Sequence, residues 1–143
     1  MTKERSAGAV LYKIINNKLF YLVEYMSLGH ISLPKGHLEK NESDLEAAKR
    51  EIFEETSFLV EPDTSFKHVI SYHPYKDRPE IKKDVVFFVA KVNQNIIPTD
   101  KHDKEILKSE FVSFDEAMKL LTHESDKETL NLANSYIINK EKL

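Results

Sequence analysis

The sequence contains no cysteine and no tryptophan, and it has only three glycines among 143 residues. The absence of cysteine excludes disulfide bonds and metal sites built on thiolates. No apolar run approaches the roughly 20 residues that a membrane-spanning helix needs. The start of the chain, from Met1 to Ser6, is charged and has no apolar segment behind it. We therefore expect no membrane partner and no leader, and a cytoplasmic location by default.

Strong positive charge is also missing, because the formal net charge is −3. The molecule as a whole should not attract nucleic acid, so DNA is not an expected partner. Local pairs of cations are present, and each is open to two interpretations, contact with a phosphate or ordinary solvated surface. These pairs are Lys76 with Arg78, Lys82 with Lys83, and Lys101 with Lys104.

Motifs of several other enzyme classes are absent. None of the six histidines has another at the i, i+4 spacing of a helical zinc site. The chain also has no Gly-x-Ser-x-Gly elbow and no glycine-rich phosphate loop. Its chemistry must be sought in other residues.

One stretch stands out as an amphipathic helix with an acidic side. Ser43 followed by Glu46 has the spacing of a capping box, so we expect the helix to begin at Asp44. At about 100° per residue, one narrow arc is apolar and suits a core: Leu45, Ala48 and Ile52. The neighbouring arc gathers carboxylates: Glu51, Glu54 and Glu55. Ala47 projects close to this arc, where its small side chain would leave room for a substrate.

The acidic arc suggests a site for a divalent cation. Two carboxylates about 5 Å apart repel by roughly 3 kcal/mol at an effective dielectric constant near 20, and a cation would reverse that sign. Hard oxygen donors favour Mg²⁺ or Mn²⁺ over zinc. A tight turn at 34–36 would let backbone carbonyls approach the ion. The alternative is a solvated acidic helix face.

The spacing of these residues resembles the box of the Nudix hydrolase family. The matching positions are Gly36, Glu42, Arg50, Glu51, Ile52, Glu54, Glu55 and Phe58. The match is specific, because six fixed matches by composition arise about once in ten million starts. Ser57 departs from the pattern, since it stands where the family has a second Gly that ends the helix in the left-handed conformation.

The resemblance implies roles for these residues. It implies that Glu51, Glu54 and Glu55 are metal ligands together with the carbonyl of Gly36, and that the cofactor is Mg²⁺ (or Mn²⁺). It implies that Arg50 orients a glutamate through an ion pair and that Glu42 is its structural partner. The implied reaction is hydrolysis of a nucleoside diphosphate linked to another group, by a metal-activated water.

The rest of the chain reads as mixed strands and helices in one domain, residues 1–143. We predict strands at 6–15, 18–25, 66–72, 84–90 and 111–114, with loops at 26–41, 73–79 and 93–103. Two further capping boxes, at Ser113 and Ser125, predict helices from Asp115 to Leu121 and onward to about Asn139. The pattern predicts an α/β/α sandwich with a mixed central sheet and helices on both faces, the fold that the resemblance also implies.

Features outside the box resemble the asymmetrical diadenosine tetraphosphate hydrolases within the family. The run Leu33 to His37 resembles their entry to the box, which implies that Lys35 and His37 lie near the phosphate chain. Lys83 resembles a lysine that contacts a phosphate, and Glu105 a further metal ligand or water-activating base. Solvated surface charge is the other interpretation of Lys35, His37 and Glu105. Tyr72 and Tyr75 are candidates for stacking on adenine, or for ordinary packing at a sheet edge.

These observations predict an enzyme whose partner is a small nucleotide. The predicted activity is metal-dependent hydrolysis of dinucleoside polyphosphates, splitting diadenosine tetraphosphate into ATP and AMP. The predicted catalytic residues are Glu54, Glu51, Glu105 and Arg50. One alternative is removal of pyrophosphate from RNA 5′ ends, or broad action on NTPs and nucleotide sugars; another is a nucleotide-sensing module with an idle box. Either a monomer or a homodimer is compatible with the sequence.

Overall fold

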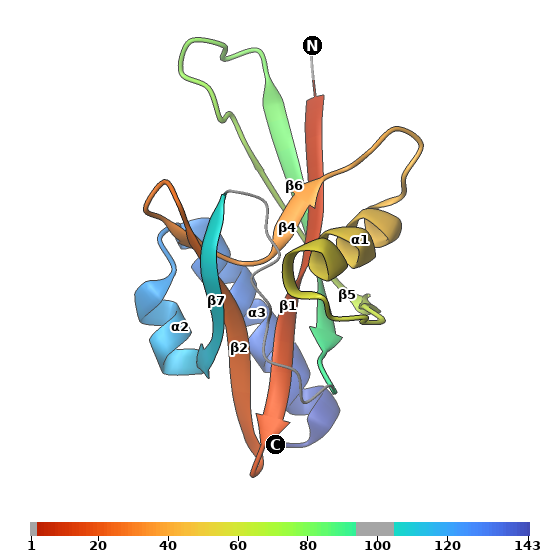
Figure 1. Ribbon diagram of the computed structural model, residues 1–143, viewed down its shortest axis with the longest axis vertical. Coiled ribbons are helices and arrows are strands. Elements are labelled where there is room, and N and C mark those ends of the chain that lie inside the picture. Colours follow the sequence, from red (N-terminus) through yellow and green to blue (C-terminus); the bar gives the residue numbers. More distant parts are fainter. Residues whose placement is uncertain (1–2, 94–104) are drawn as a thin grey trace.

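The computed structural model describes residues 3–93 and 105–143. All of the predicted loop 93–103 except Asn93 lies outside the described residues, and so do Lys101 and Lys104. The elements are shown in Figure 1. In chain order they are β1 (Lys3–Ile15), β2 (Lys18–Met26), β3 (Ile31–Ser32), β4 (Lys35–His37), α1 (Asp44–Thr56), β5 (Asp63–Tyr72), β6 (Lys82–Lys91), β7 (Ile106–Ser113), α2 (Phe114–Leu120) and α3 (Glu124–Glu141).

The strands form one mixed sheet built around the long strand β1. β1 pairs in parallel with β6 along ten positions, whereas β2, β4 and β5 pair antiparallel with their neighbours. The other edge of β1 is shared, because β4 pairs with its first half at 6–8 and β2 pairs with its second half at 12–15. β4 therefore fills the gap where β2 diverges from β1, and its Gly36 lies against Glu51 of α1.

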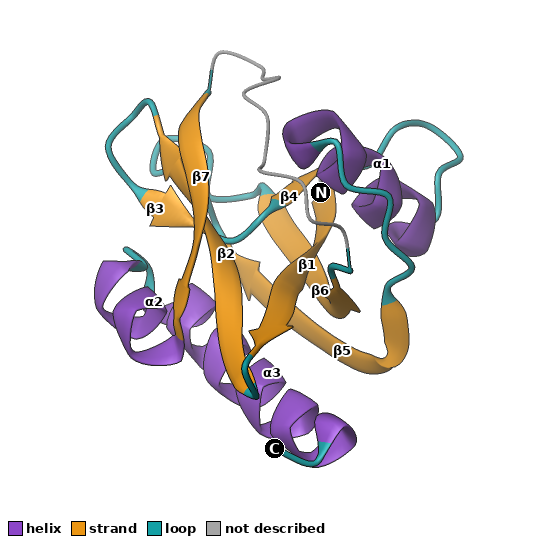
Figure 2. Cartoon of the chain, turned by 60° about the horizontal axis from the view of Figure 1, so that its bottom comes forward, coloured by secondary structure: helices purple, strands orange, loops and turns teal. Residues whose placement is uncertain are grey.

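Helices cover both faces of this sheet, as Figure 2 shows. One buried cluster joins β1 and β6 to α1 through residues such as Ala7, Val86 and Ile52. The other joins the opposite face to α2 and α3 through residues such as Val10, Val85 and Leu130. Residues of β6 alternate between the two clusters, which is why this strand is apolar without a period of two. The predicted α/β/α sandwich is confirmed.

Local signals fixed several elements as predicted. Asn16 and Asn17, at the turn between β1 and β2, both have positive φ, as two-residue hairpin turns require. At α1, the Ser43 and Glu46 side chains each bond the other's backbone N–H, so the capping box is confirmed. Ser57 closes α1 in the left-handed conformation (φ 68°), the role predicted for the missing glycine.

Three predictions were wrong. The segment 26–41 is not a loop throughout, since β3 and β4 form within it by pairing with β2 and β1. α3 starts two residues earlier than predicted, with His123 in place of Ser125 as N-cap and no side-chain capping bond, so Ser125 lies inside the helix. Ala47 is fully buried in the core below α1 and leaves no room for a substrate. Long-range pairing and packing decided each case.

No helix among residues 3–93 and 105–143 is both long enough and apolar enough to cross a membrane.

Candidate active site

Arg50 organises the carboxylates at the start of the site. Its Nε and Nη2 donate to the two carboxylate oxygens of Glu42 at 2.7 and 3.0 Å, and Nη2 also donates to the carbonyl of His37 at 2.9 Å. Hydrogen bonding to Glu42 raises the pKa of Arg50, and the reciprocal bond lowers the pKa of Glu42. The bidentate pair therefore fastens the loop before α1 and the end of β4 to the helix.

The same guanidinium also holds two predicted metal ligands. Arg50 Nη1 donates to Glu51 Oε1 at 2.8 Å and to Glu54 Oε2 at 3.2 Å. Burial raises the pKa of Glu51, and the charge of Glu54 adds to this, whereas Arg50 opposes both. Glu55 is almost fully buried, with 7% of its surface exposed. Arg50 thus forms ion pairs with Glu51 and Glu54 and holds these two carboxylates side by side on α1.

Gly36 on β4 lies directly against the Glu51 carboxylate. A Cβ placed on Gly36 would lie 2.0 Å from Glu51 Cδ and 2.1 Å from Oε2, so only glycine leaves room for this carboxylate in its present position. The close approach puts the β4 backbone beside α1. Strand and helix thus share one small polar space.

The residues around this space fit a hard divalent cation, whose preferred donors are carboxylate and carbonyl oxygens. Those available are Glu51, Glu54, Glu55 and the backbone of Gly36, the last set by the glycine cradle. As the side chains stand, no three His, Asp or Glu groups in the described part of the chain are arranged to hold an ion. Arg50 Nη1 engages one carboxylate oxygen of Glu51 and one of Glu54, so binding of an ion would require these side chains to rearrange.

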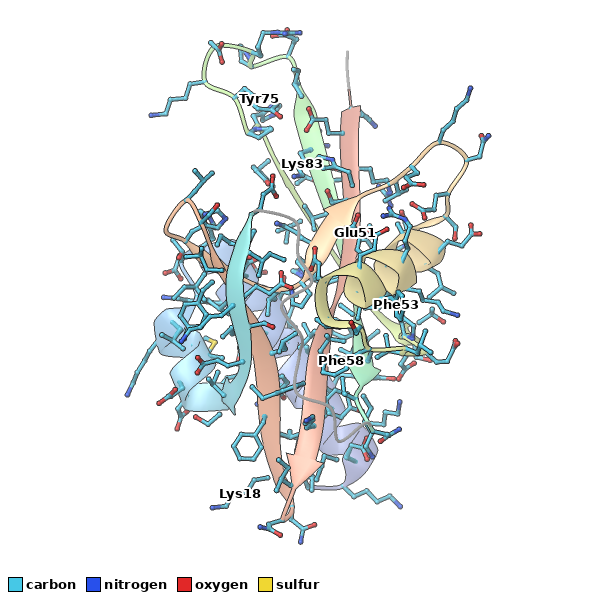
Figure 3. The ribbon with its side chains drawn as sticks, in the orientation of Figure 1. Lys18, Glu51, Phe53, Phe58, Tyr75 and Lys83 are labelled. Carbon is cyan, nitrogen blue, oxygen red and sulfur yellow. The ribbon has the colours of Figure 1, made fainter. Side chains whose placement is uncertain are left out.

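Lys35 and Lys83 lie on the opposite face of the sheet from this cluster. Strand pairing puts Lys83 beside Glu4 on β1 and Tyr72 on β5, and alternation puts it on the face covered by α3. Burial lowers the pKa of Lys83 and the charge of Lys35 lowers it further, while Glu4 and Glu105 oppose the shift. Figure 3 shows Lys83 and Glu51 at the same end of the sheet.

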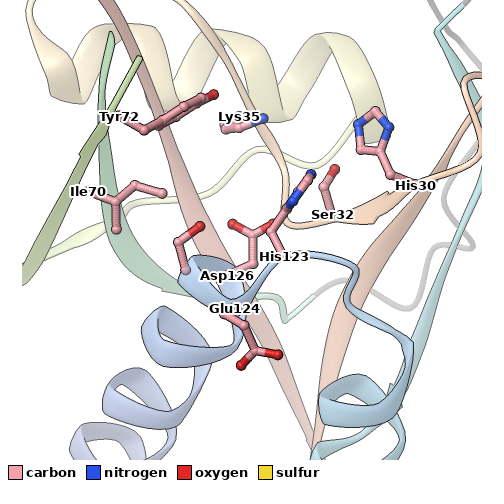
Figure 4. Close-up of a pocket in the computed structure, with 9 residues that line it drawn as sticks. His30, Ser32, Lys35, Ile70, Tyr72, His123, Glu124 and Asp126 are labelled. Atoms are coloured by element: carbon pink, nitrogen blue, oxygen red, sulfur yellow. The ribbon is translucent and has the colours of Figure 1, made fainter. Parts of the chain in front are cut away.

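A cavity of about 370 Å³ opens on this α3 face (Figure 4). Its lining residues are His30, Ser32, Lys35, Ile70, Tyr72, His123, Glu124, Ser125 and Asp126. Among them are the predicted residues Lys35 and Tyr72. No local motif links His30, His123 and Asp126, so they could not be recognised as neighbours before the structure was known. Only the packing of the α3 start against β3 and β5 brings them together.

Other predicted residues lie elsewhere. The hydroxyl of Tyr75 donates to the Glu4 carboxylate at 3.2 Å, and Tyr75 lines a separate cavity in the loop after β5, so the two tyrosines do not share a pocket. His37 is exposed and contributes its backbone carbonyl to Arg50. The backbone of Glu105 accepts a bond from the Ser27 N–H, and its charge acts on His30 and Lys83. The roles predicted for these residues stay predictions.

A sheet between helices, with an arginine-fastened carboxylate cluster beside a glycine cradle, matches one class of protein. The model of the NUDIX domain matches residues 4–133, and the chain therefore belongs to the NUDIX family.

Its relatives include proteins named phosphatase NudJ. The one from Shigella boydii is 36% identical over 86 residues, which cover 60% of this chain and 53% of that protein. The one from Escherichia coli K12 is 35% identical over the same length. The chain thus spans about half the length of these relatives.

Solved structures share the fold over almost the whole chain. A Caenorhabditis elegans Ap4A hydrolase in a binary complex superposes with a TM-score of 0.84, at 21% identity, covering 95% of this chain and 98% of that one. The NUDIX domain of Shewanella oneidensis NrtR, complexed with ADP ribose, gives a TM-score of 0.75 at 14% identity, covering 96% and 90%. Identities this low show a common fold.

Proposed function

We propose that this chain is a divalent-metal-dependent hydrolase of phosphoric anhydride bonds in nucleotides, and that dinucleoside polyphosphates are its substrates. The observation that carries the proposal is the continuity of two sites through β4. Lys35 lines the cavity on the α3 face, and the next residue, Gly36, backs onto the Glu51 carboxylate. A nucleoside held in the cavity would lead its phosphates past Lys35 to the carboxylates.

In this proposal the residues of α1 bind the metal ion and keep its ligands in position. When bound to Glu51, Glu54, Glu55 and the Gly36 carbonyl, a Mg²⁺ or Mn²⁺ ion would neutralise phosphate charge and lower the pKa of an attacking water. Arg50 would keep Glu51 in position, because its guanidinium is itself held by hydrogen bonds to Glu42 and to the His37 carbonyl. Glu105 is the proposed further base or ligand from outside the helix.

The residues on the α3 face would hold the substrate. The ammonium group of Lys35 lies close enough to that of Lys83 for its charge to lower the pKa of Lys83, and two neighbouring cations suit a chain of several phosphates more than a single anionic group. Tyr72 offers a ring face for base stacking at the mouth of the cavity. His37, exposed at the end of β4, is the proposed contact for the leaving nucleotide.

The relatives support this class of activity. The fold is that of an Ap4A hydrolase and of a domain solved with ADP ribose, both concerned with nucleotides that carry a diphosphate or longer. The name phosphatase NudJ agrees with action on phosphate esters or anhydrides. We therefore infer ATP and AMP as the products from diadenosine tetraphosphate.

The test is separation of products by chromatography after incubation with diadenosine tetraphosphate, ATP and a 5′-triphosphorylated oligoribonucleotide, with and without Mg²⁺. We expect Mg²⁺-dependent formation of ATP with AMP, and its loss in Glu54→Gln. Glu61→Gln, the same change at an exposed residue paired with Lys49, is the matched control and should keep full activity. Pyrophosphate released only from the RNA would contradict the substrate, and normal turnover by Glu54→Gln would contradict the metal site.

A further inference from the structure

Asp126 is a buried carboxylate that the catalytic scheme above does not use. Only 3% of its surface is exposed, although it lies in the first turn of α3. Its carboxylate makes no side-chain hydrogen bond or ion pair with any residue of 3–93 or 105–143. It lines the cavity on the α3 face, where Figure 4 shows it between His123 and the start of the helix. A buried charge without a bonding partner is costly, which points to a partner brought by a ligand.

The cavity around Asp126 is lined by three aromatic rings, those of Tyr72, His30 and His123. The Tyr72 ring lies on one side, and the imidazoles of His30 and His123 lie on the other, with centroids 5.8 Å apart. A volume of about 370 Å³ is in the range of small-molecule sites. Aromatic side chains stack on any nucleobase, so they hold a base without choosing it.

The charges around Asp126 decide what its carboxylate can do. Burial raises the pKa of Asp126 above its ordinary value, and the charges of Lys35 and His123 oppose this shift without cancelling it. The amino-terminal end of α3 also favours the anion. An ionised carboxylate only accepts hydrogen bonds, so the complementary group must be a donor. Adenine and cytosine carry an exocyclic amino donor at the ring position where hypoxanthine and uracil carry a carbonyl oxygen.

We infer that Asp126 is a specificity-determining residue that accepts a hydrogen bond from the exocyclic amino group of a nucleobase in this cavity. The inference rests on the proposed function, because it places the nucleoside end of the substrate beside Asp126. The ring walls hold the base, Lys35 meets its phosphates, and Asp126 discriminates against bases without an amino group.

The test compares diadenosine with diinosine tetraphosphate, whose bases differ by replacement of the amino group with a carbonyl. We expect kcat/KM to favour the adenine compound by about tenfold or more in the natural chain, as for a hydrogen bond to a charged group. In Asp126→Leu, which removes the acceptor but keeps the branched shape of the side chain, the ratio should fall close to one. Asp126→Asn keeps a carbonyl oxygen and adds a donor for hypoxanthine, so its ratio should lie between the two.

Glu128→Gln is the control, because it changes an exposed carboxylate on the same helix and should keep the natural ratio. Thermal unfolding of each variant separates misfolding from altered base preference. If Asp126→Leu does not fold, the comparison is made with Asp126→Asn alone. Calorimetric binding of AMP and IMP repeats the comparison without turnover. Base preference in binding without hydrolysis would overturn the proposed function alone. An equal response to both bases, or an unchanged ratio in both Asp126 variants, would overturn the role of Asp126.

Discussion

The carboxylate cluster on α1 and the cavity on the α3 face are built in opposite ways. The cluster draws its side chains from a short stretch, 36–55, in which helical spacing and one arginine bring them together. The cavity draws on β3, β4, β5 and α3, with lining residues that run from Ser32 to Asp126 along the chain. Local periodicity can thus build a reactive centre, whereas a pocket that selects a substrate depends on strand pairing. The two regions meet at Lys35 and Gly36.

The largest effect should come from Gly36→Ala. The added Cβ would meet the end of the Glu51 side chain, which can swing away, so the fold should survive while the carboxylate is displaced. A displacement of about 1 Å can cost about a hundredfold in rate. Steady-state hydrolysis at varied Mg²⁺, together with thermal unfolding, checks this.

Gly29→Ala is the matched control for the added methyl. Gly29 has φ of +100° and open space around it, so alanine there strains the backbone and should lower stability while hydrolysis continues. If Gly36→Ala lowered the free energy of unfolding enough to account for its loss of activity, the effect would not be confined to the position of Glu51.

The next effect should come from Arg50→Lys. Lysine keeps the charge but cannot make the paired bonds to Glu42 while also reaching Glu51 and His37. We expect activity to fall by about ten- to a hundredfold, as for other residues that support metal ligands. Stability should fall by about 1–3 kcal/mol, measured by urea unfolding. Lys49→Arg, the converse exchange at a neighbouring exposed ion pair, should be neutral in both assays.

A smaller effect is expected in the cavity. Tyr72→Leu removes a ring face, which should raise KM about tenfold, as base stacking predicts, and leave the Mg²⁺ requirement unchanged. Tyr75→Leu provides the comparison, because the two rings are equally exposed, at 41% and 42%, but Tyr75 lies in the other cavity. A larger rise in KM for Tyr75→Leu than for Tyr72→Leu would place the base in the loop after β5.

The smallest effect on activity is expected far from both regions, at Asp63. Burial alone would raise its pKa, but hydrogen bonds from Lys140, Tyr136 and the Ser65 N–H lower the pKa to about 2. Since the unfolded value is about 3.9, its stabilisation is present above pH 4 and is lost as pH falls from about 4 to 2.

Asp63→Asn should therefore lower stability by about 1–2 kcal/mol at neutral pH, after allowance for solvent screening, and not at pH 2. Melting curves over that pH range measure the difference, with exposed Asp77→Asn as the control. Hydrolysis should be unchanged. A stability difference between Asp63→Asn and the natural chain that persists at pH 2 would show that packing, and not the charge, is responsible.

Much of the fold could be predicted because its signals are local. The asparagines at 16–17, the capping box of Ser43 and the unbroken apolar run of β6 each act within a few residues. β4 could not be predicted, since a segment with Pro34 and Gly36 becomes a strand only because β1 offers it a free edge. The start of α3 could not be predicted either, because no side chain caps it and the sequence therefore carries no local signal there.

The sequence by itself determined the carboxylates of α1 and their arginine, because a helix turns a fixed spacing into a fixed face. It also determined that β6 would be covered on both sides. Only the tertiary structure decided that Gly36 lies against Glu51 and that Tyr72 and Tyr75 line different cavities. It also decided that Asp126 is buried in the cavity that Lys35 lines. These contacts join residues far apart in the chain, and such neighbours are set by the packing of strands and helices and not by spacing.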